Sequence, residues 1–385
     1  MRITHLELKN WRNFKHVDID VQKRLVLVGP NASGKSNLLD AVRFLRDLSQ
    51  PGGGFQEAVL RRGGLTRVRN LAARNFNHGH ILIRVQLGDD EEPNQWEYEV
   101  AFRGEPRGLH RPVVVRERVS RAGDLVLERP DSDDSGDADR LTQTALEQVN
   151  ANREFRAVAD FLASVRYVHL VPQMIREPGR MANRDEDPFG GDFLARIRRT
   201  PDATRGRRLA RIGRLLQAVI PQLDRLEHVT DDEGRSHLEA RYQHWREHGA
   251  RQDERDFSDG TLRLIGLLWA LLETGKSAGP LLLEEPELSL HSEVVARLPT
   301  LLARAGGRAG QVLLSSHSRE ILQDPGLGLD EIVLLKPGME GTVATLLSDE
   351  KEAVERIEDL DMNLDEVVLQ MTAPAEVAEL SLIEP

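Results

Sequence analysis

Cysteine is absent from the 385-residue sequence, which excludes disulfides, thiolate metal sites and cysteine nucleophiles. Long hydrophobic runs are absent too, because no stretch approaches the roughly 18 apolar residues that a membrane-spanning helix needs. The first residues lack the hydrophobic segment of a signal peptide, so we expect a soluble, cytoplasmic protein with no membrane partner. With 39% hydrophobic residues, a chain of this length can bury one large core or two smaller ones.

Charge is distributed unevenly along the chain. The formal net charge of -11 argues against a wholly basic nucleic-acid coat. Arginines nevertheless gather in one stretch, which contains Arg196, Arg198, Arg199, Arg205, Arg207, Arg208, Arg211 and Arg214. Two interpretations of this stretch stay open, namely contacts to nucleic-acid phosphates or the solvated face of a helix. Acidic residues dominate from Asp349 onward.

The first part of the chain predicts strands followed by one helix. Residues 3–8 and 17–21 have the pattern of short strands, and 25–28 is a continuous apolar run typical of a strand buried on both faces. A Gly-rich turn follows, and apolar residues at helical spacing then predict a helix over 38–48. Further on the period changes to two, which predicts an antiparallel meander over 81–87, 96–102 and 113–115.

The middle of the chain begins with an acidic stretch. Residues 130–137 are rich in Asp, Ser and Gly, which predicts a solvated loop and an internal boundary. Helical patterns follow at 146–162 and 193–220, with a strand predicted between them at 165–171.

The last part of the chain alternates strands and helices. A hairpin is predicted for 226–230 and 237–242, joined by turn residues 231–234, and an apolar helix for 261–272. Three apolar runs end in polar loops and suit neighbouring strands of one mostly parallel sheet, and they are 281–283, 312–314 and 332–335.

A phosphate-binding pattern lies between the buried strand and the first helix. It has a glycine, four residues and then Gly-Lys-Ser, and it consists of Gly29, Pro30, Asn31, Ala32, Ser33, Gly34, Lys35 and Ser36. Glycines let successive backbone N–H groups turn toward an anion, and the positive end of the following helix adds to the attraction. We expect Lys35 to reach the terminal phosphates of ATP and the Ser36 hydroxyl to bind Mg²⁺. Arg12 and Asn37 complete the candidate nucleotide-binding residues.

Two adjacent carboxylates follow the apolar run at 281–283. Where a buried strand meets solvent beside a phosphate loop, one carboxylate can hold Mg²⁺ and the next can orient or deprotonate the attacking water. We assign the metal role to Glu284 and the water role to Glu285. An acidic pair at a strand end is otherwise a solvated edge, and the phosphate loop is what favours chemistry here.

These motifs, in this order, resemble the ABC-type P-loop ATPases of the RecF, SMC and OLD-like group, including the AAA_21-type ATPases. Residues 10–14 look like the family's loop after its first strand, and 257–263 stand where the family carries its signature motif. Residues 288–291 are similar to its D-loop, and 315–318 to its switch-histidine loop. The resemblance spans almost the whole chain.

The resemblance also implies roles across a dimer. The signature loop of one subunit would cover the γ-phosphate bound by the other, through Ser258, Asp259 and Gly260. His317 would contact the γ-phosphate or the attacking water. By themselves, 257–261 could equally be a helix cap and a lone histidine after a strand could be structural.

Three features of the chain depart from the family or stay open. Glu284 replaces the family's usual Asp, and Asp259 and Thr261 replace more common signature residues. The glutamine that contacts Mg²⁺ in the family could be Gln56, Gln86 or Gln173.

Two other chemistries have weaker support in the sequence. Residues 244–248 fit the His-x-x-Glu-His pattern of one class of zinc peptidases, yet no third ligand is identifiable. Some relatives carry a C-terminal nuclease domain, for which the stretch after 347 is too short, and 359–361 are expected on the solvated face of a helix. No heptad stretch of the length of an SMC coiled coil is present.

We therefore expect an α/β P-loop NTPase fold, an ABC-type ATPase head with a mostly parallel core sheet, an antiparallel β meander and a helical insertion. The expected division is a first ATPase lobe (1–130), a mostly helical insertion (131–225), a second ATPase lobe (226–348) and an acidic tail (349–385). ATP and Mg²⁺ are the expected cofactors, and the expected partner is a second copy in an ATP-dependent homodimer. The switch would act on nucleic acid, or alternatively control a separate protein effector, as a regulatory subunit of a phage-defence or toxin-type module.

Overall fold

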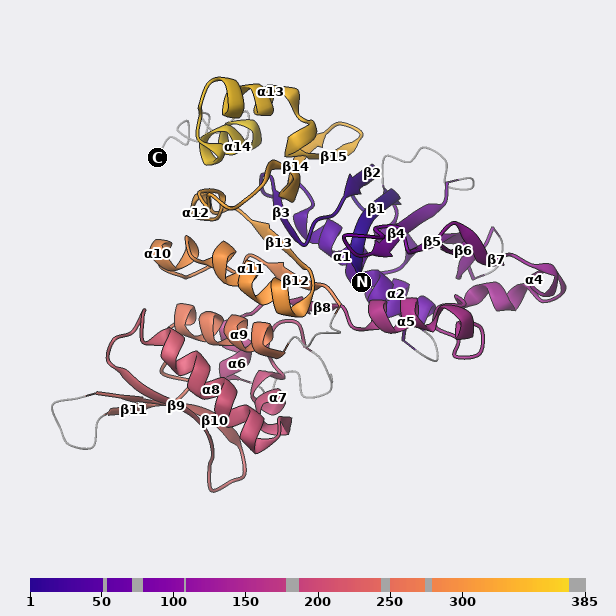
Figure 1. Cartoon of the computed structure of the whole chain (residues 1–385). Helices are drawn as coiled ribbons and strands as arrows, with labels where there is room; N and C mark the ends of the chain where they lie inside the picture. The colour runs from indigo at the N-terminus through magenta and orange to yellow at the C-terminus, as the bar shows by residue number, and fades with distance from the viewer. Residues whose placement is uncertain are drawn as a thin grey trace, which may run out of the picture. The chain divides into compact units, whose positions relative to one another are not determined.

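A computed structural model describes residues 1–50, 54–70, 79–106, 109–177, 187–243, 250–273 and 279–373. The chain divides into two compact units (Figure 1). Unit 1 comprises Met1–Arg166, Ser277–Leu282 and Gly310–Pro385, and unit 2 comprises Tyr167–Lys276 and Leu283–Ala309. Among the described residues, no helix is both long and apolar enough to cross a membrane.

An antiparallel sheet of six strands forms much of unit 1, in the order β2-β1-β4-β5-β6-β7. Its strands are β1 (Arg2–Trp11), β2 (Phe14–Asp20), β4 (Ile81–Gly88), β5 (Trp96–Gly104), β6 (Pro112–Arg121) and β7 (Asp124–Arg129). The alternation of apolar and polar residues buries one face, where Phe102 stacks on Phe44 with ring centroids 5.5 Å apart. The predicted meander is confirmed.

A second six-stranded sheet carries the phosphate-binding pattern, in the order β15-β14-β3-β13-β12-β8. Its strands are β3 (Arg24–Val28), β8 (Arg166–Val168), β12 (Leu281–Glu284), β13 (Val312–Ser316), β14 (Ile332–Gly338) and β15 (Gly341–Leu346). β3 pairs parallel with both β13 and β14, and all its residues are buried. A continuous apolar run is what a strand between two parallel neighbours requires, so the predicted parallel core is confirmed.

Unit 1 also contains eight α-helices among its described residues, several of which contact the two sheets. They are α1 (Lys35–Leu48), α2 (Gly54–Arg61), α3 (Leu65–Val68), α4 (Ser132–Gly136), α5 (Arg156–Ala163), α12 (Arg319–Leu322), α13 (Lys351–Val354) and α14 (Leu364–Thr372). α1 contacts α2, α5 and β13, whereas α14 contacts α12 and β14. The C-terminal helix therefore packs on the parallel sheet of its own unit.

Unit 2 combines helices with a three-stranded sheet in the order β11-β10-β9. Its elements are α6 (Pro172–Arg176), α7 (Phe193–Arg199), α8 (Asp202–Leu216), β9 (Leu223–Thr230), β10 (Ser236–Tyr242), β11 (Ala250–Gln252), α9 (Asp259–Glu273), α10 (Ser292–Val295) and α11 (Leu298–Ala309). Their core surrounds the fully buried Trp269 of α9. The predicted hairpin is confirmed, with Ser236 opposite Thr230.

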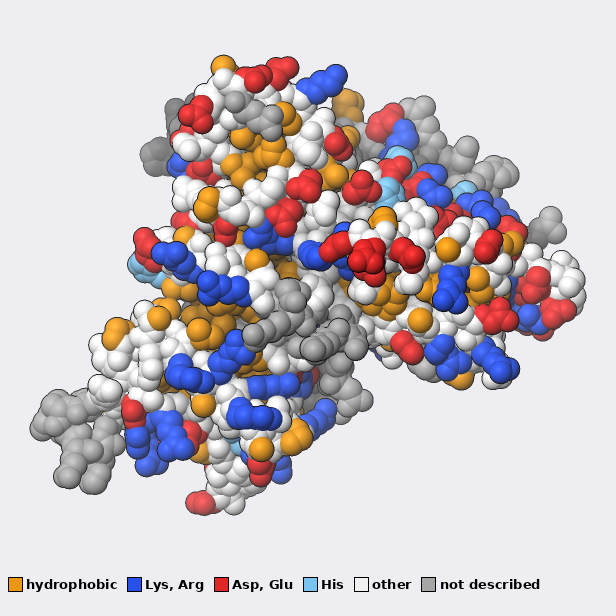
Figure 2. Space-filling model, in the orientation of Figure 1, with side chains coloured by type: hydrophobic (Ala, Val, Ile, Leu, Met, Phe, Trp, Pro, Cys, Tyr) orange, Lys and Arg blue, Asp and Glu red, His pale blue; other side chains and the backbone are white. Residues whose placement is uncertain are grey.

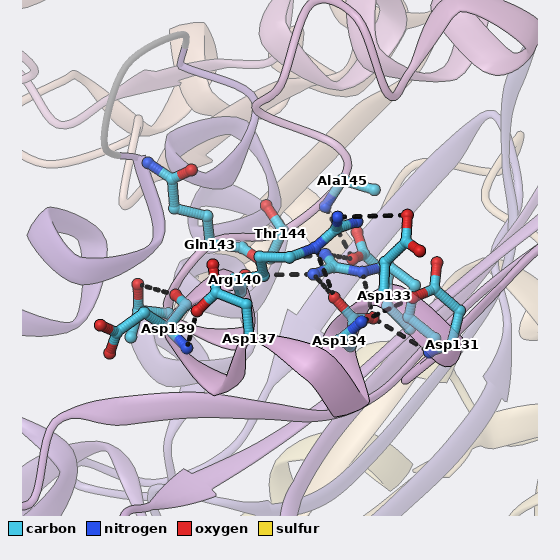
Figure 3. Close-up of polar contacts among 12 residues, drawn as sticks. Asp131, Asp133, Asp134, Asp137, Asp139, Arg140, Gln143, Thr144 and Ala145 are labelled. Atoms are coloured by element: carbon cyan, nitrogen blue, oxygen red, sulfur yellow. Dashed lines mark hydrogen bonds and ion pairs between the residues drawn. The ribbon is translucent and has the colours of Figure 1, made fainter.

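The acidic stretch at 130–137 is exposed, as its composition predicts, except at Asp134, but it forms a short helix and not a loop. It contains α4, which Asp131 and Asp134 close with a reciprocal capping box. Asp134 is fully buried and pairs with Arg129 at 2.8 Å and Arg140 at 3.1 Å (Figure 3). The two guanidinium groups and the cap neutralise this acid, which is why it can be buried.

Three predicted helices differ in extent from those observed. The pattern at 193–220 forms two helices because the chain leaves helical geometry at Thr200 and Pro201. At 146–162 only the last part is α-helical, in α5. Residues 359–361 do not form a helix face, since the chain leaves the helix at Leu360 and Asp361 has a φ of 52°.

Candidate functional site

The phosphate-binding pattern forms a loop between β3 and α1. Its backbone turns through left-handed conformations at Ala32 (φ 62°) and Gly34 (φ 99°), and α1 begins at Lys35. The Lys35 ammonium donates to the carbonyls of Gly29 at 2.9 Å and Pro30 at 3.2 Å, so it lies inside the curl of the loop. The first turn of α1 contains no acidic residue, so no side chain of that turn neutralises the positive end of the helix dipole.

Asn13 supports this loop from the side. Its amide donates to the Ser33 carbonyl at 2.8 Å and to the Thr342 hydroxyl at 2.7 Å, and its oxygen accepts from Asn37 at 2.8 Å. A Cβ at position 34 would collide with the same amide, and φ at 34 is also unfavourable for any other residue. Gly34 is therefore required by both conformation and space. The sequence signal for Asn13 was its place in the 10–14 motif, although its role was not predicted.

Arg12 makes its strongest contacts with α1. It pairs with Asp40 at 2.6 Å, and Arg62 pairs with the same carboxylate at 2.9 Å. Burial raises the pKa of Asp40, but Arg62 and Arg12 lower it by more, so the net shift is downward. The ion pair between Arg12 and Asp40 holds residues 10–14 against α1. The role of Arg12 at a nucleotide stays a prediction.

His317 is the first residue after β13, at the edge of the parallel sheet where the phosphate loop begins. β13 pairs with β3 so that Ser316 lies opposite Val28, and the next residues of the two strands are His317 and Gly29. The carboxyl ends of neighbouring parallel strands therefore bring His317 and the phosphate loop to one edge of unit 1. His317 is exposed, and Ser318 after it caps α12 by accepting from the Ile321 N–H at 3.3 Å.

The carboxylate pair lies in unit 2. Glu284 accepts a hydrogen bond from the Tyr167 hydroxyl, and one of its oxygens lies 3.6 Å from Nδ1 of His169. Burial, and then the charge of Arg263, lowers the pKa of His169, which favours a neutral ring. Tyr167 and His169 were not predicted, although their spacing of two on a predicted strand would have put them on one face.

Glu285 has a strained backbone. Its φ of 44° lies in the left-handed region, which costs a non-glycine residue about 1–3 kcal/mol. Such strain persists where the surrounding structure fixes the conformation, and it is common at functional positions.

The signature-like segment forms the start of α9. Ser258 caps the helix by accepting from the Thr261 N–H at 3.2 Å, and Asp259 pairs with Arg176 at 2.7 Å. A Cβ on Gly260 would collide with the Ser289 carbonyl, a backbone atom that cannot move away alone. Within unit 2, the signature-like and D-loop-like segments are thus in contact. The helix-cap interpretation of Ser258 is observed, and it does not exclude an anion-binding role.

The predicted site residues are thus grouped by unit. Unit 1 holds the phosphate loop, Arg12, Asn37 and His317, and unit 2 holds Glu284, Glu285 and 258–260. Ser36 and Glu284 offer hydroxyl and carboxylate oxygens, which are the donors that Mg²⁺ prefers.

The three candidate glutamines have different surroundings. Gln56 donates to the carbonyls of Pro112 and Thr142, and Gln86 donates to Glu97 on the antiparallel sheet. Gln173 lies 3.5 Å from Asp259, in the signature-like segment. The zinc-type pattern at 244–248 lies outside the described residues. In the part of the chain that is described, the only group of three possible metal ligands is Glu7, His16 and Asp18, where Lys9 and Arg84 already neutralise Glu7.

Comparison with known families gives a match over most of the chain. The model of the AAA_21 family, described as "AAA domain, putative AbiEii toxin, Type IV TA system", matches residues 24–323. The chain belongs to this family. The match includes the phosphate loop and the carboxylate pair, so the AAA_21 chain is an ABC-type P-loop ATPase of the RecF and SMC group.

Curated relatives match this AAA_21 chain over shorter stretches. The DNA replication and repair protein RecF of Picosynechococcus is 45% identical over 92 residues, which is 23% of this chain and 24% of the relative. RecF of Roseiflexus castenholzii is 36% identical over 62 residues, 16% of each chain. The chromosome partition protein Smc of Methanocaldococcus jannaschii is 49% identical over 41 residues, 10% of this chain and 4% of the relative. The chain therefore spans at most about a quarter of each of these relatives.

Solved structures with the same fold include SMC heads. An SmcHead bound to the C-winged helix domain of ScpA has a TM-score of 0.55 at 15% identity, covering 91% of this chain and 100% of the other. A head bound to the C-terminal domain of ScpA derived from Pyrococcus furiosus has a TM-score of 0.50 at 13% identity, covering 92% and 99%. The predicted fold class is confirmed.

Proposed function

We propose that this AAA_21 chain binds ATP and hydrolyses it to ADP and phosphate. The observation that carries the proposal is the curled loop of unit 1, with Lys35 inside it and α1 starting at its end. Backbone N–H groups, an ammonium group and a helix N-terminus together make a site for a chain of phosphates. The family match supports the same ligand.

The remaining residues supply the chemistry in this proposal. Ser36 and Glu284 would hold Mg²⁺, which when bound would neutralise charge on the phosphates. Glu285 orients the attacking water and accepts its proton, and His317 donates a hydrogen bond to the γ-phosphate. Tyr167 and His169 fix the carboxylate of Glu284, whose side chain is one methylene longer than the usual Asp.

The test is titration calorimetry with ATP and Mg²⁺, combined with a phosphate-release assay. We expect Lys35→Ala to weaken ATP binding at least about tenfold, since it removes the cation at the phosphates and a charge-assisted contact is worth roughly 1.5–3 kcal/mol. Lys15→Ala is the matched control, because Lys15 is 67% exposed and pairs with Glu340. Folded wild-type protein that gives no heat with ATP would contradict the proposal.

We propose further that ATP joins two copies, with Ser258, Asp259 and Gly260 of one copy closing the site of the other. The start of α9 supports this role because Ser258 is exposed and the helix is long enough, at 15 residues, to present a positive end. Hydrolysis would then release the dimer, which makes the chain a switch.

Nucleic acid is the first candidate for what the switch controls. Of the predicted arginines, Arg196 and Arg208 lie near Glu273 and Arg205 pairs with Asp202, so these three are engaged within unit 2. Exposed arginines remain on α7 and α8, and they are Arg198, Arg199, Arg207, Arg211 and Arg214. Figure 2 shows basic side chains gathered over this part of unit 2. These exposed groups support contacts to phosphates.

The salt dependence of duplex DNA binding tests this candidate. Replacing Arg207 and Arg211 by Gln removes two contacts, so we expect the slope of log affinity against log salt to fall by about 2. A control that replaces Arg61 and Arg118, exposed arginines of unit 1, changes the net charge equally and should keep the slope. Equal slopes in all three proteins would contradict the candidate.

Control of a separate effector is the second candidate. The description of the family, which includes a toxin of a Type IV toxin–antitoxin system, favours it. Exposed acids after Asp349, such as Glu352 and Asp361, offer negative charge on which such an effector could dock. A toxin or nuclease gene next to the gene for this chain would support it, whereas salt-dependent DNA binding would support the first candidate.

A further inference from the structure

Two side chains of α12 meet one carboxylate of the C-terminal helix. Arg319, the first residue of α12, forms an ion pair with Asp365 of α14. Gln323, the residue that ends α12, donates to the same oxygen of Asp365 at 3.1 Å. We call Arg319, Gln323 and Asp365 the α12 brace. All three belong to unit 1, where α12 lies against α14 (Figure 1).

α12 needs such support because it is only one turn long. A helix of four residues is far too short to be stable alone. Ser318 caps its start, and Ile321 and Leu322 are buried beneath it. The brace adds contacts at both ends of the turn, so it restrains the direction in which the chain enters and leaves α12.

Asp365 is suited to this task. The residue is 3% exposed, whereas the side chain of Arg319 is 52% exposed. Burial raises the pKa of Asp365, but hydrogen bonds from Arg319 and Gln323 lower it by more, so the carboxyl is ionised at neutral pH. A nearly buried charge with two donors is held more tightly than an exposed ion pair.

The chain enters α12 directly from the switch-histidine segment. His317 stands between β13, which ends at Ser316, and Ser318, which caps α12. Because β13 is fixed by its register with β3, α12 determines how the chain continues on the other side of His317. We propose that Asp365 is a positioning residue for His317, so that the C-terminal helix α14 sets the rate of ATP hydrolysis through the α12 brace. This inference rests on the proposed ATPase function.

Three variants test the inference, with ATP affinity, turnover and amide hydrogen exchange measured on the full chain. We expect Asp365→Asn and Arg319→Ala to lower kcat about tenfold, to leave ATP affinity within about twofold, and to speed exchange at 317–323. Arg319→Lys keeps the positive charge and should retain most of the wild-type turnover. Since Arg319 is half exposed, its truncation keeps the test valid even where Asp365→Asn folds poorly.

Glu352→Gln is the control, because Glu352 is an exposed acid of the same C-terminal segment whose ion-pair partner is Arg356. It should resemble wild type in all three measurements. Wild-type turnover in both Asp365→Asn and Arg319→Ala would overturn the inference and leave the proposed function intact. A loss of turnover that is explained by weaker ATP binding would also overturn the inference. The same holds for a loss of turnover that the control Glu352→Gln shows as well. Failure of the proposed function is a separate result, seen as the lack of Lys35-dependent turnover in the wild type.

Discussion

Asn13 joins two stretches of unit 1 that are far apart in the sequence, residues 33–37 and β15. Its side chain contacts the phosphate loop at Ser33, the first turn of α1 at Asn37 and the strand β15 at Thr342. We expect Asn13→Ala to weaken ATP binding roughly tenfold, because the loop carbonyl and two side chains lose their partner, at about 1–3 kcal/mol for an unsatisfied buried group. Calorimetry with ATP and denaturant unfolding would separate the loss of affinity from the loss of stability.

Asn10→Ala is the matched control for this change. Asn10 lies in the same 10–14 motif, near the end of β1, but its amide donates to the His80 carbonyl at 2.9 Å and makes no contact with Ser33 among the described hydrogen bonds. ATP affinity should therefore stay near that of the wild type. If both variants lose affinity equally, the effect belongs to the loop as a whole and not to Asn13.

Sequence patterns predicted the residues whose geometry is local. Gly34 and Lys35 follow from a motif of eight neighbouring positions, and their conformations match it. Tyr167 was missed because its partner Glu284 lies 117 residues away, a contact that no local pattern specifies. The role of Asn13 was missed for the same reason, since its partners lie at 33–37 and at 342.

At the scale of elements, long apolar patterns predicted strands and helices better than charged ones did. β3, the meander and α9 were confirmed because burial dictates their period. The burial of Asp134 in α4 was not predicted, because its partner Arg129 lies at the end of β7 and pairs with it only in the folded chain. Charge in a sequence predicts exposure only where no partner is folded against it.

The β9–β10 hairpin carries a pH-sensitive group. His237 on β10 lies 2.8 Å from Glu254 and 3.2 Å from Asp231, which follows β9. The hydrogen bond with Glu254 raises the pKa of His237 above 6.5, although partial burial opposes it. The charged ring therefore stabilises the folded state fully below pH 6.5, and this stabilisation is lost as pH rises through the raised pKa.

We expect the difference in unfolding free energy between wild type and His237→Gln to be largest near pH 5.5 and to shrink toward pH 8.5. Urea unfolding at both pH values, followed by exchange in β9 and β10, measures it. His110→Gln is the control, because His110 is exposed on unit 1 and its Nδ1 contacts only a backbone acceptor, the Glu105 carbonyl, at 2.9 Å among the described hydrogen bonds. A difference that grows with pH would mean that the sign of the shift is wrong.

For the whole molecule, the order of residues in the sequence does not indicate which stretches of the chain form each unit. Unit 1 gathers three separate stretches of chain, because β13 and β14 return to pair with β3. Long-range pairing of this kind is set by the register of buried strands and not by any local boundary signal. The boundaries at 130, 225 and 348 stay a prediction, and so does the second copy that the signature-like segment would meet.

The dimer can be tested by trapping ATP. Glu285→Gln removes the proposed base while keeping the side-chain shape, so ATP should stay bound and the two copies should stay together. Light scattering with ATP should then give twice the 43.3 kDa of the monomer, whereas wild type with ATP should return to the monomer mass as hydrolysis proceeds.

A second substitution in the trapped protein separates dimerisation from nucleotide binding. Ser258 is exposed at the start of α9, so the double variant Ser258→Arg, Glu285→Gln should fold. Each copy should still bind ATP at its own phosphate loop. The arginine side chain at position 258 would occupy the space that the γ-phosphate bound by the other copy needs. The mass measured by light scattering with ATP should therefore remain that of a monomer. Glu285→Gln protein that is saturated with ATP yet never exceeds the monomer mass would contradict a site closed by two copies, because nucleotide binding would then be complete within one chain.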